Sequence, residues 1–239
     1  FTPFEYLLQF EKAWQNADIT NFMRKQSICW MNSMKMFPKI LGYEYFLSVD
    51  SLEKTLQLPT NLMKEFALFK YLSILLDKKM LKALTPIILK TPSQKLFHIN
   101  LNLQTIVSKN FYDFQKAIGR ECVVEIDRAD ILWDLDGFYF AYNFLKSHKH
   151  RMGLDLLQGN NLKFFHNSDL ICDYYKIAVS DTLFSLHTED LKIFCEKVGH
   201  DKIILTHCDN LNTIEKALDL GITQFQGFLL DSMLRQKES

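Results

Sequence analysis

The stretch HRMGLDLLQGNN, from His150 to Asn161, decides the fold class of this chain. A short apolar run reaches a single carboxylate, Asp155, and then gives way to a Gln-Gly-Asn-Asn loop. In parallel α/β proteins, reactive groups lie where the C-terminal end of a strand opens into a loop. The pattern therefore predicts a strand that ends at the rim of a site, with Asp155 on that rim.

Strand-like and helical segments alternate on both sides of this stretch. The expected strands cover residues 95–102, 121–127, 151–156, 173–179, 202–208 and 222–228. Helical runs are expected between them, among them 133–147, 189–198 and 211–220, the last ending at Gly221 as a helix C-cap. Such alternation requires a parallel sheet with right-handed crossovers.

The N-terminal part has a different pattern. Residues 24–33 and 39–48 are β-rich and are joined by a connection too short for a helical crossover, so we expect an antiparallel pair. Helices are expected over 4–16 and from Pro59-Thr60 to Leu84. Eight strands in 239 residues predict one domain, 1–239, with an α/β fold: a modified TIM-type barrel whose first strand is antiparallel.

Composition narrows the classes of function. The 28 basic and 28 acidic residues give a net charge of zero, which disfavours nucleic-acid binding. No apolar run reaches the length of a membrane span, so no membrane insertion by this segment is expected. The five cysteines are scattered without a CxxC pair and indicate reduced, buried thiols in a cytoplasmic protein. The first residue is Phe1, and the chain is read as a fragment of a larger or membrane-anchored signalling protein.

Polar residues at the strand ends should share one rim of the barrel. Glu44, Asn100, Glu125 and Asp155 make an all-oxygen set suited to one Mg²⁺ or Mn²⁺. Lys176 would orient a metal-bound water or neutralise a phosphate oxygen, which suggests metal-assisted phosphodiester hydrolysis. The alternative is a structural cluster, in which Lys176 forms an ordinary buried ion pair with Glu125 or Asp155.

The order of these segments resembles the EAL-domain phosphodiesterases, which linearise cyclic di-GMP in a barrel with an antiparallel first strand. The resemblance covers nearly the whole chain. Its motifs are Gln26-Ser27-Ile28 for QPI, Gly42 to Leu47 for GYEALL, Asn100-Leu101-Asn102 for NLS, Glu125 to Arg128 for ELTE, Gly153 to Leu157 for the strand into DDFG, Lys176-Ile177-Ala178 for KID, Thr206 to Asp209 for EGVE and Gln226 to Leu229 for QGY.

The resemblance implies roles for the retained residues. Glu44, Asn100, Glu125 and Asp155 match the ligands of the family's first metal ion. Lys176 matches the catalytic lysine, here vestigial, and Gln26 and Gln226 match ligand-binding positions.

Other family positions are replaced. Leu156 stands where an acid binds the second metal ion, and Thr206 where a glutamate prepares the attacking water. Arg128 reverses the charge of a glutamate that holds the dimer-contacting loop, Ser48 replaces a phosphate-reading arginine, and Ala178 replaces the aspartate of KID. Because leucine binds no metal and threonine is no base near neutral pH, we expect little or no phosphodiesterase activity.

The sequence therefore predicts a degenerate EAL domain in bacterial cyclic di-GMP signalling. It would act as a non-hydrolytic receptor, with cyclic di-GMP binding weakened or lost, or as a module that binds a regulatory protein partner. The alternative is a residual metal-dependent phosphodiesterase that produces linear pGpG. Residues 162–171 are a candidate docking surface, but the favoured interpretation is that Phe164 and Phe165 are core residues of a helix packed on the barrel. A homodimer is left open.

Overall fold

The computed structural model describes residues 5, 18–48, 51, 66–91 and 95–238. Two compact units share the chain, and each is built from separate segments. The first unit comprises Phe1–Arg24, Tyr45–Ser93 and Leu101–Arg120, and the second comprises Lys25–Glu44, Gln94–Asn100 and Glu121–Ser239.

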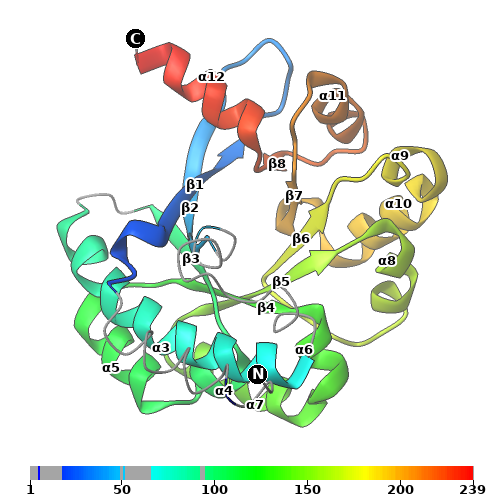
Figure 1. Cartoon of the computed structure of the whole chain (residues 1–239). Coiled ribbons are helices and arrows are strands. Elements are labelled where there is room, and N and C mark those ends of the chain that lie inside the picture. The colour runs from blue at the N-terminus through cyan, green and yellow to red at the C-terminus, as the bar shows by residue number, and fades with distance from the viewer. Residues whose placement is uncertain (1–4, 6–17, 49–50, 52–65, 92–94, 239) are drawn as a thin grey trace. The chain divides into compact units, whose positions relative to one another are not determined.

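A closed barrel of eight strands, in the order β1 to β8, organises the described residues (Figure 1). The strands are β1 (Met23–Trp30), β2 (Lys39–Leu47), β3 (Leu96–Asn100), β4 (Val123–Asp127), β5 (Arg151–Leu157), β6 (Tyr174–Ala178), β7 (Ile203–Thr206) and β8 (Gln224–Phe225). The first strand runs antiparallel to its neighbours, whereas β3 to β8 pair in parallel. The predicted fold class, including the antiparallel first strand, is confirmed.

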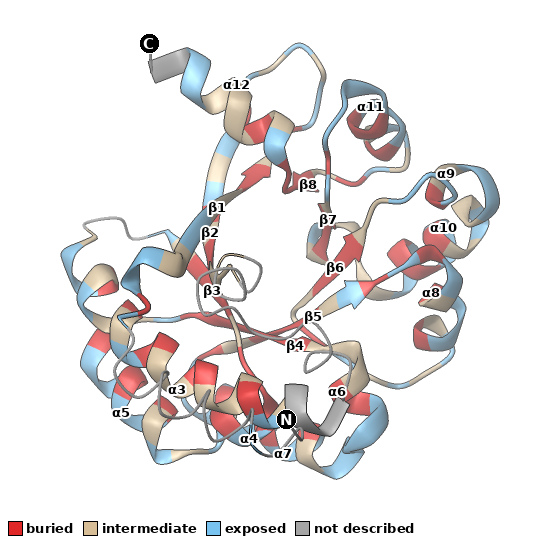
Figure 2. Cartoon of the chain, viewed as in Figure 1, coloured by how far each residue is buried: buried red, intermediate tan, exposed pale blue. Residues whose placement is uncertain are grey.

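The register of the parallel strands aligns the predicted site residues. Asn100 on β3 pairs with Glu125 on β4, and Asp127 pairs with Asp155 on β5. Strand β4 is buried along almost its whole length, as the red ribbon in Figure 2 shows. A strand covered on both faces needs an almost continuous apolar sequence. Glu125 interrupts that sequence, which marks it as a residue with a buried polar partner.

Helices follow the strands of the second unit, as right-handed parallel crossovers require. They are α6 (Arg128–Trp133), α7 (Leu135–Ser147), α8 (Gly159–His166), α9 (Leu183–Leu186), α10 (Thr188–Val198), α11 (Leu211–Asp219) and α12 (Phe228–Glu238), with a 3-10 turn at His200–Lys202. Gly221 adopts φ +77°, a left-handed conformation that glycine reaches without steric cost, and the predicted C-cap after α11 is confirmed.

The first unit contains the long helix α3 (Phe66–Lys90) with α4 (Leu103–Ile106), α5 (Lys109–Ile118) and a 3-10 turn at Thr20–Phe22. Helix α3 continues past the predicted end at Leu84 and includes Pro86. Ile88 beyond the proline is 2% exposed, so apolar burial offsets the hydrogen bond that proline removes. The helix expected over 4–16, and the start of α3 expected near Pro59, lie outside the described residues.

The five cysteines are free and buried, as predicted. All of them lie in segments of the second unit. Burial raises the pKa of Cys29, Cys195 and Cys208 to about 12, because the apolar surroundings disfavour a thiolate. Among the described residues, no helix is both long and apolar enough to cross a membrane.

Candidate functional site

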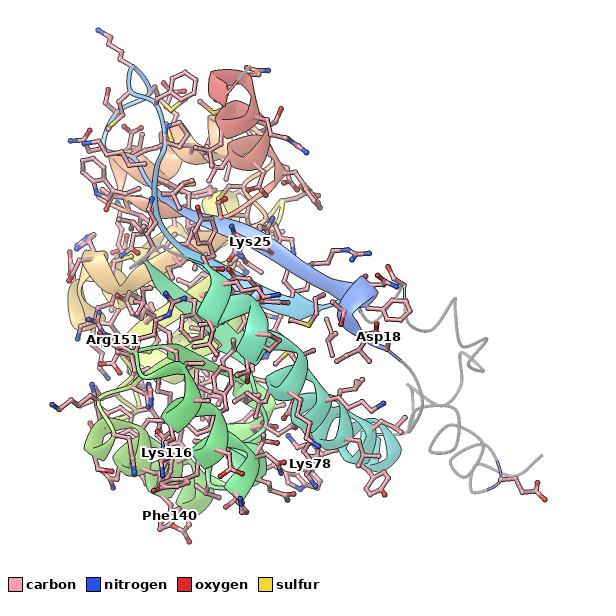
Figure 3. The ribbon with its side chains drawn as sticks, turned by 90° about the vertical axis from the view of Figure 1, so that its left-hand side faces the viewer. Asp18, Lys25, Lys78, Lys116, Phe140 and Arg151 are labelled. Atoms are coloured by element: carbon pink, nitrogen blue, oxygen red, sulfur yellow. The ribbon has the colours of Figure 1, made fainter. Side chains whose placement is uncertain are left out.

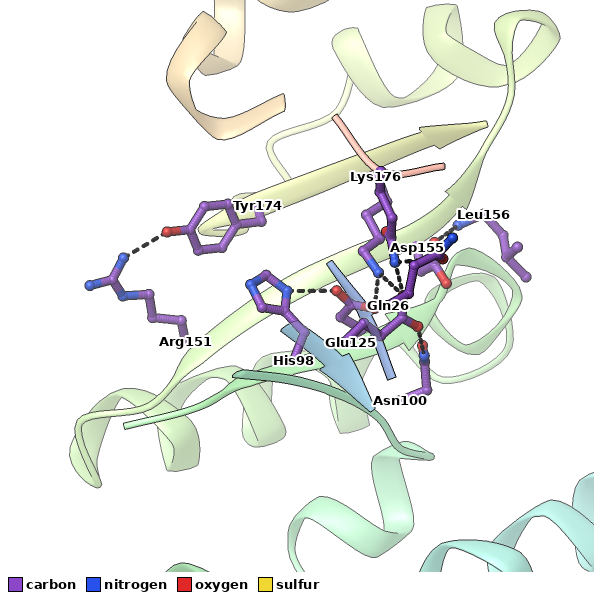
Figure 4. A network of polar contacts seen from close by, with 11 residues as sticks. Gln26, His98, Asn100, Glu125, Arg151, Asp155, Leu156, Tyr174 and Lys176 are labelled. Atoms are coloured by element: carbon purple, nitrogen blue, oxygen red, sulfur yellow. Dashed lines mark hydrogen bonds and ion pairs between the residues drawn. The ribbon is translucent and has the colours of Figure 1, made fainter. Parts of the chain in front are cut away.

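The second unit carries a cluster of polar side chains on the inner faces of its strands (Figure 4). Six predicted site residues meet there through hydrogen bonds and ion pairs: Gln26 from β1, Glu44 from β2, Asn100 from β3, Glu125 from β4, Lys176 from β6 and Gln226 just after β8. The seventh, Asp155, leaves the adjacent strand β5. Residues separated by up to 200 positions are thus brought together by barrel closure.

Lys176 lies at the centre of the cluster. Its Nζ donates to Glu44 Oε2 at 2.7 Å and to Glu125 Oε2 at 2.6 Å. The side chains of Lys176 and Glu125 are 3% and 1% exposed, and that of Glu44 is 11% exposed. A buried charge is tolerated when it is paired and hydrogen-bonded, and here one ammonium serves two carboxylates. The predicted structural alternative, an ion pair between Lys176 and Glu125, is present.

Glu44 accepts two further hydrogen bonds from side-chain amides. Asn100 Nδ2 donates to Glu44 Oε1 at 2.6 Å, and Gln226 Nε2 donates to Glu44 Oε2 at 2.5 Å. Gln226 Nε2 also lies 3.1 Å from Gln26 Oε1. Gln226 Oε1 is buried and has no hydrogen-bond partner among the residues that the structure describes. A donor supplied by water or by a ligand would satisfy this oxygen.

His98 is a member of the cluster that the sequence reasoning missed. Its Nδ1 lies 2.7 Å from Glu125 Oε1, and its ring packs against Tyr174, whose hydroxyl accepts from Arg151 (Figure 4). His98 precedes Asn100 by two positions, and side chains two apart leave the same face of a strand. This two-residue spacing could have identified His98 as a member of the cluster from the sequence.

The electrostatics of the cluster follow from burial and from Lys176. Burial opposes ionisation of Glu44, yet Lys176 keeps its pKa below the usual value. Burial pushes the pKa of Glu125 upwards, but the Lys176 ammonium bonded to it acts in the opposite direction and favours the carboxylate form. Burial raises the pKa of Asp155 to about 7. Burial also lowers the pKa of His98 well below its usual value, and the nearby Lys176 lowers it further. His98 is therefore neutral and its Nδ1–H donates to Glu125.

Asp155 differs from the other carboxylates of the cluster because its hydrogen bond comes from the backbone amide of the next residue. Its Oδ1 accepts from the amide of Leu156 at 2.7 Å. Leu156 has φ +58°, in the left-handed region, and the register between β5 and β6 shifts between Leu154 and Leu157. The side chain of Leu156 is 46% exposed. A leucine with positive φ is strained, and such strain concentrates at functional sites.

Replacing Leu156 by asparagine should stabilise the protein. The left-handed conformation costs an ordinary residue about 1–2 kcal/mol, whereas asparagine adopts it more readily, so we expect a gain of about 0.5–1 kcal/mol. Thermal unfolding should show a midpoint about 2 °C higher. The matched control is Leu157→Asn, which places an amide at a fully buried position and should destabilise. A lower thermal unfolding midpoint for Leu156→Asn than for the wild type would contradict the inference that the backbone at Leu156 is strained.

A divalent cation does not fit this arrangement. The four carboxylate oxygens of Glu44 and Glu125 all accept hydrogen bonds from protein groups. Asn100 presents its amide nitrogen, a donor, and turning the amide would set two acceptor oxygens against each other. Among the described residues, no group of three or more His, Cys, Asp or Glu side chains is arranged to hold a metal ion.

A second buried carboxylate, Asp77, belongs to the first unit. Its Oδ2 accepts from the amide of Asn102 at 2.8 Å, from Asn102 Nδ2 at 2.7 Å and from Thr105 Oγ1 at 2.8 Å. Asp77 therefore ties helix α3 to the turn that follows β3. Its pKa is raised to about 6, because burial outweighs the three hydrogen bonds. Asp77 was not among the site residues predicted from the sequence.

Comparison with known proteins gives a result for structure but not for sequence. No model of a known protein family matches the chain, and no curated protein sequence matches it. The FimX EAL domain of Xanthomonas citri, solved with c-diGMP, has a TM-score of 0.64 at 9% identity, over 94% of this chain and 91% of that chain. The FimX EAL domain of Pseudomonas aeruginosa, bound to c-di-GMP, has a TM-score of 0.58 at 15% identity, over 93% of both.

The likeness extends to a larger protein. The S helix-GGDEF-EAL structure of Vibrio cholerae LapD, bound to c-di-GMP, has a TM-score of 0.66 at 14% identity. The match covers 96% of this chain but only 57% of the LapD chain. Identities this low report on the fold alone. The chain has the fold of an EAL domain.

Proposed function

We propose that this chain is a non-hydrolytic EAL-type domain of cyclic di-GMP signalling, acting as a receptor or as a regulatory protein-interaction module. The observation that carries the proposal is the double ion pair of Lys176 with Glu44 and Glu125. It uses the oxygens that a metal-dependent reaction would need. The replacements at Leu156 and Thr206 support the same conclusion, since two-metal hydrolysis requires a second ligand set and a prepared water.

Receptor function is supported by the fold and by the polar surface near the strand ends. Three similar structures, those of the two FimX EAL domains and LapD, were solved with c-di-GMP. A pocket of about 380 Å³ lies beyond β6 and β7, and Ser180, His207, Asn210 and Lys216 are among its lining residues. The amide, hydroxyl and ammonium groups of such a pocket can donate to phosphate or base edges.

Interaction-module function is supported by exposed apolar side chains. On α6 and α7, Leu132 and Phe140 are each 64% exposed and Trp133 is 78% exposed, and Phe140 projects away from the ribbon in Figure 3. In the predicted docking stretch, Phe164 is exposed whereas Phe165 is core. Clustered aromatic and leucine side chains on a surface commonly mark a contact with another protein.

The purified protein should not hydrolyse cyclic di-GMP. With Mg²⁺ or Mn²⁺ present, chromatography should show linear pGpG formed at least about 100-fold more slowly than by an active EAL enzyme assayed alongside, since losing one group that stabilises the transition state commonly costs that much. Turnover at the rate of the active enzyme would overturn the proposal.

Isothermal titration calorimetry then separates the two roles. A receptor should release or absorb heat with micromolar cyclic di-GMP, and Gln26→Ala should reduce that binding. No heat at high micromolar ligand would remove the receptor role and leave the interaction module.

A further inference from the structure

The four carboxylate oxygens of Glu44 and Glu125 are already hydrogen-bonded by other groups of the protein. Glu125 Oε1 is bonded to His98 and Glu125 Oε2 to Lys176. Glu44 Oε1 is bonded to Asn100, and Glu44 Oε2 to both Lys176 and Gln226. A hard divalent cation requires several oxygen ligands at about 2.0–2.6 Å. It could use these oxygens only by breaking the bonds that now satisfy them.

Lys176 cannot easily give way to such a cation. Its side chain is 3% exposed and lies between the two carboxylates with which it pairs. A cation that took over Glu44 and Glu125 would leave an ammonium buried beside a like charge, without its partners. Removing the partner of a buried charge is strongly unfavourable. The ammonium is covalently attached to the chain. Unlike a dissolved metal ion, it therefore remains at the site whatever the solution composition.

The neighbouring amides have the wrong polarity for a metal centre. Asn100 and Gln226 both direct nitrogen donors towards Glu44, and neither directs its carbonyl oxygen there. The neutral ring of His98 donates from Nδ1 to Glu125 Oε1. Three protein groups are thus oriented around anionic carboxylates and not around a cation. Hydrogen-bond donors of this kind hold a carboxylate in one fixed orientation.

We propose that the Lys176 ammonium takes the place of a divalent cation between Glu44 and Glu125, so that the cluster binds neither Mg²⁺ nor Mn²⁺. The retained acids are then parts of an internal ion-pair network, positioned by His98, Asn100 and Gln226. This inference rests on the same site as the proposed function, but the two fail separately. Mn²⁺ binding without turnover would overturn only the inference, and absence of cyclic di-GMP binding would remove only the receptor role.

A titration with Mn²⁺ tests the proposal in the wild-type chain. The electron paramagnetic resonance signal of free Mn²⁺ should fall no more with the wild type than with Asp155→Asn, up to millimolar concentrations. Asp155 is the suitable control because it is a predicted ligand whose described hydrogen bond goes to the backbone. Saturable Mn²⁺ binding by the wild type that Asp155→Asn weakens about tenfold or more would overturn the proposal.

A second variant tests whether Lys176 occupies a cation position. Lys176→Ala removes the ammonium and frees oxygens of Glu44 and Glu125, so this variant should gain Mn²⁺ binding and its thermal midpoint should rise with Mn²⁺. The wild-type midpoint should not change. A folded Lys176→Ala protein that binds no Mn²⁺ would overturn the assignment. If this variant does not fold with or without Mn²⁺, the comparison of wild type with Asp155→Asn decides.

Discussion

Lys176→Met is expected to lower the free energy of unfolding by about 3–5 kcal/mol, because removing one partner of a buried ion pair leaves uncompensated charge. Methionine keeps most of the volume of the lysine stem, so the loss reports the ammonium and not a cavity. Glu44 and Glu125 would then face each other in the barrel interior without their common cation. Urea denaturation followed by circular dichroism gives the value.

A triple variant separates charge from packing. Lys176→Met combined with Glu44→Gln and Glu125→Gln removes the ammonium and both carboxylates together. This variant should recover a large part of the lost stability, because replacing a complete buried ion pair by neutral groups is often neutral or stabilising. A cost below about 1 kcal/mol for Lys176→Met alone would be typical of a surface pair and would contradict the buried network.

Asp77→Ala should be the second most damaging substitution, with a loss of about 3 kcal/mol. The buried backbone amide of Asn102, its side-chain amide and the Thr105 hydroxyl would lose their common acceptor. Each buried donor left unsatisfied costs about 1–3 kcal/mol, although relaxation recovers part of the sum. Asp77→Asn is the matched control, since its amide oxygen can still accept while the negative charge is gone.

The free energy of unfolding should also depend on pH differently in the wild type and in Asp77→Asn. The pKa of Asp77 is about 6 in the folded protein and 3.8 in its ordinary state. A raised carboxyl pKa means that the folded state holds the proton more tightly than the unfolded state. The cost of the charge is therefore fully present above pH 6 and is relieved as the pH falls towards 4.

Stability measurements at several pH values check this expectation. From pH 7 down to pH 4, the wild type should gain about 2.5 kcal/mol relative to Asp77→Asn, since each pKa unit corresponds to about 1.4 kcal/mol and the unfolded carboxyl begins to take up its proton near pH 4. Asp77→Asn should be the more stable protein at pH 7. A difference between the two that does not change with pH would show that Asp77 is not buried as an anion.

Much of the barrel follows from sequence pattern, because strands and helices have different apolar periods. The eight strands and the antiparallel first strand were predicted correctly, whereas element ends were less accurate. Strand β8 was expected over 222–228 but covers Gln224–Phe225, and the backbone of Gln226 continues to pair with Leu205 and Cys208 beyond it. Helix α3 continues beyond Pro86 because burial of apolar side chains in the tertiary structure compensates for the proline. Local sequence rules do not include this burial.

The sequence predicted which residues form the cluster, but not which of their atoms are hydrogen-bonded to one another. Strand-end position and family resemblance selected Glu44, Asn100, Glu125, Lys176 and Gln226, and barrel closure does bring them together. The sequence could not show which oxygen faces which donor, since that depends on register and rotamer. Nor did it reveal the left-handed backbone of Leu156. The roles of these residues in metal and ligand binding stay predictions.

Because of where the cysteines lie, thiol labelling can detect local unfolding in one unit of the chain and not in the other. All five thiols are buried in the second unit, and the residues of the first unit contain none. A thiolate that forms only when its surroundings open can be alkylated only during such an opening. The rate of labelling therefore records local unfolding around β1, β4, α10 and the ends of β6 and β7, and an opening confined to α3 or α5 leaves no trace.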